Sequence, residues 1–357
     1  MESIYYAMSW ACHRKCRHCY ETRFRPYVRG ALDGVVAQAA DNFPRVIDNL
    51  PRKMTYLDRN APLPGGGYRE KTGRIILAGG EVLLDPVREA VLYPAMERLQ
   101  AKYGRGGIKI IVQTTGDLVT PQIIEDLLER GVWMISISGM DDFHVGMEGE
   151  KRLPLIARLE GWFAQAGINR SGWQADNSDN IAWSDEDGPL YHFFGATEDE
   201  WIGKLWPRGR AWENSLSTAG MEDNFCADWA GARNFLDHRH SGSEVSVDPS
   251  GDVFPCCAKT KLPVGNLTEE PLTEILDSLA GHPVYQALSE GRPDRMGLEF
   301  GWDEARFAEA CQTVTPAGKA YSNPCIGCDR FHEEVMVREI TRLRQQRRAR
   351  RMACKAA

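Results

Sequence analysis

The chain has 357 residues, of which 43% are apolar and 26% are charged, and its formal net charge is -7. This composition is typical of globular proteins and excludes disordered, fibrous and membrane-spanning classes. The first residues, MESIYYAMSW, lack the pattern of a signal peptide, so we expect a cytoplasmic protein. In a reducing compartment, ten cysteines favour metal binding over disulfide bonds.

Apolar runs and helical patterns alternate in the first half of the chain. Four apolar runs predict strands, at residues 4–9, 74–78, 108–112 and 133–137. Apolar residues at helical spacing predict helices over residues 33–49, where Pro44 interrupts the pattern, and over 86–102, 121–129 and 152–166. Residues 51–73 are rich in Pro, Gly and charge and predict a loop. The alternation predicts an α/β fold with parallel strands, a partial (β/α)6 TIM-like barrel.

The pattern weakens after residue 166. Ile168 begins a weak fifth strand, residues 170–212 are irregular and rich in Trp, and residues 244–255 predict a hairpin. We therefore expect three parts: a barrel over residues 1–215, a small α+β extension over 216–335, and a C-terminal basic helix over 336–357.

Positive charge is concentrated at the C-terminus. Residues 342–355 contain seven Lys or Arg and no acid, so the rest of the chain carries -14. A nucleic-acid-binding protein would carry a basic face on its folded body, which this body lacks. We expect the tail to be a solvated helix end, with a binding arm as the alternative.

The first cysteine cluster has the spacing C-x3-C-x2-C in the sequence CHRKCRHCY. Cys12, Cys16 and Cys19 follow the first predicted strand, so they lie on a loop. Three thiolates on one short loop can hold three irons of a 4Fe-4S cluster and leave the fourth iron open to another ligand. A zinc site is the alternative, although no second pair of ligands at zinc-finger spacing lies nearby.

This spacing after a first strand resembles the radical S-adenosylmethionine (SAM) superfamily. Further matching positions follow in order: His18 before the third cysteine, the GGE sequence, polar residues after later strands, and a GRA segment. The resemblance implies cofactor-binding roles for nine residues: His18, Gly79, Gly80, Glu81, Thr115, Ser136, Ser138, Gly209 and Arg210. The family often has Asp where Ser138 stands. A glycine pair also lets the backbone approach a ligand closely.

The later cysteines resemble the SPASM and twitch extensions of this superfamily. The resemblance implies that four of them hold one auxiliary 4Fe-4S cluster: Cys226, Cys256, Cys325 and Cys328. A zinc ribbon is the alternative for these four. Cys257 and Cys311 are spare, and we consider both as hydrogen-atom donors or as buried packing residues.

The resemblance also implies the chemistry. An external one-electron reductant of the flavodoxin or ferredoxin type would drive cleavage of SAM to a 5′-deoxyadenosyl radical, which abstracts hydrogen from a substrate. We expect a small, hydroxylated metabolite that is dehydrogenated or epimerised, because Cys12 stands too near the start for a peptide-leader domain. Asp176, Asp179, Asn180 and His192 could bind its hydroxyl groups.

Two alternatives remain open. The first is a maturase that makes a thioether or carbon-carbon cross-link in a ribosomally made peptide. The second is a zinc protein that binds nucleic acid through the basic tail. No membrane partner is expected.

Overall fold

The computed structural model describes residues 1–172, 187–195, 204–228 and 230–356. It divides into two compact units, each built from more than one stretch of chain. We call residues 6–43 and 74–218 the parallel-sheet unit, and residues 1–5, 44–73 and 219–357 the hairpin unit. Three predicted binding residues, Asp176, Asp179 and Asn180, lie outside the described residues. The proposed boundaries at residues 215 and 335 stay predictions.

The parallel-sheet unit contains strands in the order β1-β4-β5-β6-β8-β7. Its strands are β1 (Ser3–Ala7), of which the last two residues belong here, β4 (Arg74–Ala78), β5 (Lys109–Thr114), β6 (Val132–Ser138), β7 (Asn169–Arg170) and β8 (Leu190–Phe194). The β4-β5, β5-β6, β6-β8 and β7-β8 pairs are parallel. The predicted parallel α/β architecture is confirmed.

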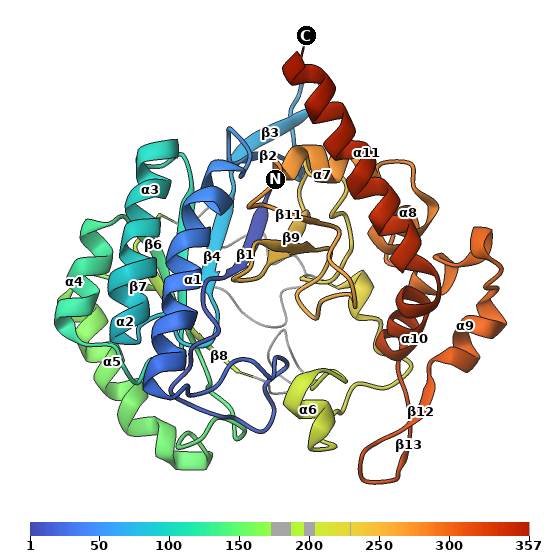
Figure 1. Ribbon diagram of the computed structural model, residues 1–357. Helices are drawn as coiled ribbons and strands as arrows, with labels where there is room; N and C mark the ends of the chain where they lie inside the picture. The colour runs from blue at the N-terminus through green and yellow to red at the C-terminus, as the bar shows by residue number, and fades with distance from the viewer. Residues whose placement is uncertain (173–186, 196–203, 229, 357) are drawn as a thin grey trace. The chain divides into compact units, whose positions relative to one another are not determined.

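Helices cover one face of these strands, as Figure 1 shows for α3, α4 and α5. The helices and helical turns of this stretch are α1 (Arg29–Asp48), α2 (Asp85–Val87), η1 (Arg88–Leu92), α3 (Tyr93–Tyr103), α4 (Pro121–Glu129), η2 (Gly149–Arg152), α5 (Leu153–Gln165) and α6 (Gly209–Glu213). Thr120 caps α4 by accepting a hydrogen bond from Ile123 N, and Pro121 occupies its first position. These signals explain why the predicted and observed bounds of α4 agree.

Two predictions about this part of the chain were wrong. Residues 190–194, placed in an irregular stretch, form β8, which pairs with β6. Residues 51–73, predicted as a loop, form the antiparallel strands β2 (Thr55–Pro62) and β3 (Tyr68–Thr72) of the hairpin unit. Pro64 and Gly65 to Gly67 occupy the connection between the two strands, while Tyr56 and Asp58 of β2 are buried.

Besides β2 and β3, the hairpin unit contains two further groups of paired strands. Its remaining strands are β9 (Glu244–Val247), β10 (Asp252–Phe254), β11 (Gly265–Asn266), β12 (Gln312–Val314) and β13 (Ala320–Ser322). β10 pairs antiparallel with β9 and with β11, as the hairpin prediction requires. Its helices and helical turns are η4 (Phe225–Ala227), α7 (Leu272–Leu279), α8 (Pro283–Ser289), η5 (Pro293–Arg295), η6 (Leu298–Phe300), α9 (Glu304–Ala310), α10 (Pro324–Phe331), η7 (His332–Met336) and α11 (Val337–Ala356).

The basic C-terminal helix forms, but it is not wholly solvated. Arg347 is only 3% exposed and makes a bidentate ion pair with the buried carboxylate of Glu270, at 2.8 and 2.9 Å. Arg351 donates to the same carboxylate at 2.6 Å. These contacts anchor α11 within the hairpin unit, so the expectation of a solvated helix end was wrong for these two arginines.

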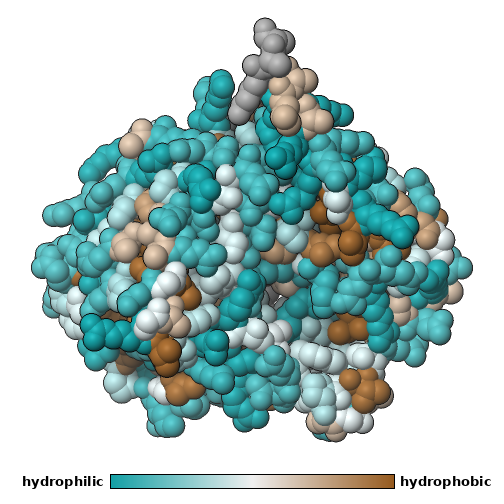
Figure 2. All heavy atoms as spheres, viewed as in Figure 1, coloured by the Kyte–Doolittle hydropathy of each residue, from teal (hydrophilic) through white to brown (hydrophobic). Residues whose placement is uncertain are grey.

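The visible surface is mostly hydrophilic, with scattered apolar side chains (Figure 2). Isolated apolar residues of this kind are normal on globular proteins. Within the described residues, no helix is long and apolar enough to cross a membrane.

Candidate cluster sites

The cysteine loop follows β1 in the parallel-sheet unit. Cys12 and Cys16 are buried and Cys19 is partly exposed. Burial raises the pKa of Cys12 to about 12, and the nearby charges of Glu81, Cys19 and Cys16 contribute to the same rise. The three sulfurs therefore lie within electrostatic reach of one another. Three cysteines on one loop, two of them buried, fit a metal cluster, whose positive charge would stabilise their thiolate forms.

Arg210 holds this loop in place. The side chain is 5% exposed and donates hydrogen bonds to backbone carbonyls of the loop and its continuation. Its four acceptors are the carbonyl oxygens of Cys16 at 2.8 Å, Glu21 at 3.4 Å, Thr22 at 2.9 Å and Phe24 at 2.7 Å. The backbone N–H of Arg210 also donates to Cys19 O at 2.8 Å. The GRA segment thus supports the cysteine loop directly.

Gly209 must be glycine for the same packing. It adopts a φ of +50°, and a Cβ there would lie 2.4 Å from the Tyr20 carbonyl group. Any other residue at this position would therefore be strained, both by the contact of its Cβ and by the left-handed backbone conformation. The structure places Gly209 against the backbone that follows Cys19.

The Gly79-Gly80-Glu81 sequence packs against the start of the loop. A Cβ on Gly80 would lie 2.1 Å from Ala11 O and 3.0 Å from Cys12 Cβ. The backbone N–H of Glu81 donates to Ala11 O at 2.9 Å. The close approach that the glycine pair permits is therefore to the backbone of the cysteine loop.

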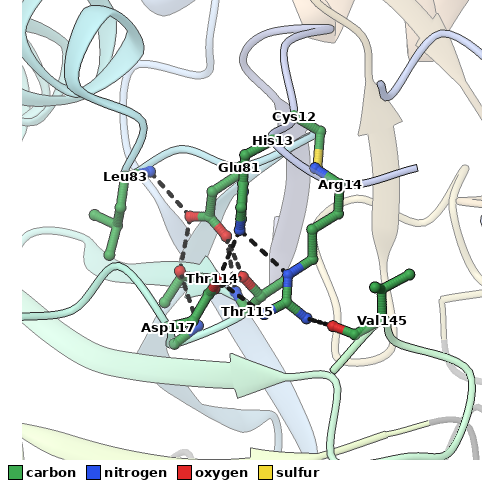
Figure 3. Close-up of polar contacts among 10 residues, drawn as sticks. Cys12, His13, Arg14, Glu81, Leu83, Thr114, Thr115, Asp117 and Val145 are labelled. Carbon is green, nitrogen blue, oxygen red and sulfur yellow. Dashed lines mark hydrogen bonds and ion pairs between the residues drawn. The ribbon is translucent and has the colours of Figure 1, made fainter. Parts of the chain in front are cut away.

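The Glu81 carboxylate organises the loop after β5. It is 2% exposed and both of its oxygens accept hydrogen bonds (Figure 3). The donors are Leu83 N at 3.0 Å, Thr114 Oγ1 at 2.7 Å, Thr115 N at 2.9 Å and Thr115 Oγ1 at 2.8 Å. The predicted cofactor residues Glu81 and Thr115 are thus brought together, and they bind each other.

Asp117 extends this network toward the cysteine loop. Its carboxylate lies 2.7 Å from His13 Nε2 and 2.8 Å from Arg14 Nη2, as Figure 3 shows. Burial alone would raise the pKa of Asp117, but hydrogen bonds from His13, Thr115 and Arg14 hold it well below its usual value. Sequence reasoning missed Asp117, although it lies just after a strand end, where active-site residues gather in parallel α/β folds.

The serines of β6 have separate partners. Ser138 Oγ donates to Thr114 O at 3.2 Å, and Ser136 Oγ lies 3.4 Å from Nε2 of His192 on β8. Burial lowers the pKa of His192 to about 4, so this ring is neutral at pH 7. Ser136 and His192 therefore form a polar pair across two neighbouring parallel strands.

His18 lies beside a second group that sequence reasoning missed. Its ring centroid is 4.4 Å from that of His144 and 5.6 Å from that of Phe143, both in the loop after β6. Burial and the neighbouring His144 lower the pKa of His18 to about 4. The Asp141 carboxylate fixes the loop by accepting hydrogen bonds from the backbone of Phe143 and His144 at 2.9 and 3.0 Å.

The second cysteine set lies in the hairpin unit. Burial raises the pKa of Cys328 well above its usual value, and the charges of Cys226, Asp329, Cys325 and Cys256 raise it further. The charges of the other three predicted ligands therefore act on Cys328, although the four cysteines are up to 102 positions apart in the chain. All four are buried.

One group of possible metal ligands lies outside the two cysteine sets. Among the described residues, His18, Asp141 and His144 place their ligand atoms within 4.8 Å of one another. The Asp141 carboxylate already caps its own loop, so we assign no ion to the His18 group.

The two spare cysteines have different surroundings. Burial raises the pKa of Cys257 well above its usual value, and the charge of the buried Glu244 adds to this rise. Cys311 is fully buried between α9 and α10, where a Cβ on Gly327 would lie 2.6 Å from its sulfur. Cys311 thus packs against α10, and burial and the charge of Cys325 raise the pKa of its thiol, as burial and the charge of Glu244 do for Cys257.

Residues 240–295 match the SPASM family, described as an iron-sulfur cluster-binding domain. This match confirms the predicted SPASM-type domain, which spans the hairpin with Cys256. A search of curated proteins found no match.

Solved structures give weak similarities. BtrN in complex with AdoMet and 2-DOIA has 14% identity and a TM-score of 0.43, over 82% of this chain and 89% of that chain. Native anSMEcpe with bound AdoMet has 14% identity and a TM-score of 0.42, over 96% of this chain and 99% of that chain. Streptococcus suis SuiB bound to S-adenosylmethionine has 14% identity and a TM-score of 0.38, over 80% of this chain and 67% of that chain.

Proposed function

We propose that this SPASM-domain chain is a radical SAM enzyme with one catalytic and one auxiliary 4Fe-4S cluster. The observation that carries the proposal is the presence of two separate cysteine sets, one of three and one of four, in which every cysteine except Cys19 is buried. Three ligands leave an iron open for SAM, and four close a cluster completely. The SPASM match independently supports iron and sulfide in the second set.

The residues present fit this pair of cofactors. Cys12, Cys16 and Cys19 would hold the catalytic cluster, and Cys226, Cys256, Cys325 and Cys328 the auxiliary one. When bound, the catalytic cluster and SAM would supply a carbon radical able to abstract hydrogen from an unactivated position. The protein's own task is then to position both partners and exclude side reactions.

Several side chains would serve this positioning. Arg210 fixes the cysteine loop through its four carbonyl acceptors. Hydrogen bonds between Glu81 and Thr115 link the segments that follow β4 and β5. The neutral ring of His18 offers a flat surface for an adenine base.

The substrate proposal is a small, hydroxylated metabolite that is dehydrogenated or epimerised. Ser136 and His192 support it, since they present a hydroxyl and a neutral imidazole on adjacent strands. Groups of this kind exchange hydrogen bonds with alcohols. The predicted binding residues Asp176, Asp179 and Asn180 lie outside the described residues and stay predictions.

Anaerobic reconstitution tests the proposal. We expect about eight irons per chain, and 5′-deoxyadenosine from SAM once dithionite is added. Colourless protein containing zinc, or iron-loaded protein that leaves SAM intact, would contradict it. Deuterium transfer from labelled alcohols into 5′-deoxyadenosine then identifies the substrate class, and transfer only from a precursor peptide would favour peptide maturation.

The outcome of the reaction depends on the spare cysteines, of which we propose Cys257 as the hydrogen donor. In an epimerase, Cys257→Ala should abolish epimer formation while SAM is still consumed, because the substrate radical is no longer quenched. Cys311→Ala serves as the matched control and should retain turnover. If both variants keep full turnover, neither cysteine is the hydrogen donor, as expected for a dehydrogenation.

A further inference from the structure

One continuous helical run carries half of the auxiliary cysteine set. It comprises α10, η7 and α11, and Cys325 and Cys328 lie one turn apart in its first segment. His332 follows Cys328 by four residues and lies on the same face of the helix. Its side chain is fully buried.

The His332 side chain contacts Cys328, which lies one helical turn before it. Its Nδ1 lies 2.8 Å from Cys328 O and 3.5 Å from Cys328 Sγ. Nδ1 therefore carries the proton, since a carbonyl oxygen can only accept. The same N–H is within reach of both the carbonyl and the thiolate sulfur.

The helix changes its hydrogen-bonding pattern at this residue. Residues 332–336 form a π-helical turn, η7, between two α-helical segments. Such turns are uncommon and often occur at functional sites, because they displace side chains from their regular positions.

Tyr285 of α8 is a second buried donor in the hairpin unit. Its ring is fully buried, and its hydroxyl has no hydrogen-bond partner among the described residues. Burial raises the pKa of Tyr285, the charge of Arg347 lowers it, and the charge of Cys328 raises it. The phenol therefore lies within electrostatic reach of the Cys328 sulfur.

A buried hydroxyl without a partner costs about 1–3 kcal/mol, so native proteins rarely retain one. An auxiliary cluster on Cys328 would add sulfide and thiolate acceptors in this region. The unpaired hydroxyl of Tyr285 is thus explained by an acceptor that arrives with the cluster.

We propose that His332 and Tyr285 donate hydrogen bonds to the sulfur atoms of the auxiliary cluster around Cys328 and so raise its reduction potential. The inference rests on the proposed function, since it requires that cluster. Hydrogen bonds to cluster sulfurs stabilise the reduced form, which carries one more negative charge. A raised potential suits a cluster that accepts an electron from a substrate radical.

The test isolates the auxiliary cluster by replacing Cys12, Cys16 and Cys19 with Ala. This background should bind about four irons, and its cluster potential is measured by anaerobic redox titration with electron paramagnetic resonance. Tyr285→Phe removes only the hydroxyl. We expect it to lower the potential by an amount that changes the ratio of oxidised to reduced cluster about tenfold, or 59 mV for one electron.

Two further variants and a control complete the test. His332→Leu should also lower the potential, and His332→Gln, which keeps an N–H donor, should restore part of it. Tyr68→Phe, at a partly exposed position in β3, should leave the potential unchanged.

The possible failures are distinguishable. A background that binds no iron refutes the auxiliary cluster itself, and with it the proposed hydrogen bonds. A background with four irons whose potential is the same in Tyr285→Phe and in both His332 variants overturns the inference alone. If His332→Leu does not fold, Tyr285→Phe still decides the matter.

Discussion

The two cysteine sets are built in opposite ways. The three cysteines of the parallel-sheet unit lie within eight consecutive positions on one loop, whereas the four of the hairpin unit come from η4, the segment after β10, and α10. The first set is local in sequence but depends on distant residues to hold its backbone. The second is dispersed, and its ligands are carried by elements that must each be anchored separately. The comparison shows that ligands close together in the sequence still depend on distant residues to hold their backbone in place.

The strongest test of this contrast removes the support of the cysteine loop. Arg210→Met leaves four carbonyl oxygens of the loop without their Arg210 donor, and we expect a loss of about 4 kcal/mol in the stability of the parallel-sheet unit. Iron bound at the loop should fall, while iron at the auxiliary set stays. Urea unfolding and iron analysis measure both effects.

Arg208→Met is the matched control for this variant, because the Arg208 side chain donates to the adjacent Pro207 carbonyl. We expect little change in iron content. If Arg210→Met keeps its full iron content at the loop, the loop does not depend on this arginine.

A second test weakens the anchor of the helical run that carries Cys325 and Cys328. Glu270→Gln breaks the buried pair with Arg347 and should cost about 3 kcal/mol of unfolding free energy at pH 7. Burial alone would raise the pKa of Glu270, but the hydrogen bonds and charge of Arg347 lower it overall. The carboxylate therefore stabilises the fold above its unfolded pKa of about 4.3, and this stabilisation is lost as the pH falls through the folded value.

Wild type and Glu270→Gln should accordingly differ most near neutral pH and converge below about pH 4. Glu274→Gln is the control, since this partly exposed carboxylate contacts Arg351 at 3.3 Å and should contribute about 0.5 kcal/mol or less. A constant difference between wild type and Glu270→Gln from pH 3 to 7 would contradict the assignment.

The smallest expected effect comes from the glycine that packs beneath the cysteine loop. Gly80→Ala places a Cβ 2.1 Å from Ala11 O, and we expect a loss of about 2 kcal/mol together with weaker iron binding at the loop. Gly34→Ala, in α1 with open space around it, should instead stabilise the protein by up to ~1 kcal/mol. If the two variants had the same unfolding free energy and the same iron content at the loop, the close packing of Gly80 would be unimportant.

Much of the parallel sheet could be predicted because its signals are local. The Thr120-Pro121 sequence fixes the start of α4, and buried apolar runs mark β4, β5 and β6. The strands β2 and β3 could not be predicted in this way, since their charged residues and the Pro and Gly of the turn dominate the pattern. Their pairing is set by contacts within the hairpin unit, such as the ion pair of Lys71 with Asp58 at 2.6 Å.

The cysteines could be found from spacing, but their supporting residues could not. Arg210 acts on carbonyls 186 to 194 positions away, and backbone acceptors leave no trace in a sequence. Asp117, Asp141 and His144 follow strand ends, a signal that places them near the site without giving their roles. Nothing in the sequence distinguishes Tyr285 and His332 from other core residues. Their relation to Cys328 becomes visible only in the structure.

Iron analysis of two cysteine variants tests the central claim, two independent clusters in one chain, most directly. The triple Ala variant at Cys12, Cys16 and Cys19 should keep about four irons and make no 5′-deoxyadenosine. The quadruple Ala variant at Cys226, Cys256, Cys325 and Cys328 should also keep about four irons, all at the loop. Zinc in place of iron in either variant, or the loss of all iron from the triple variant, would contradict the claim.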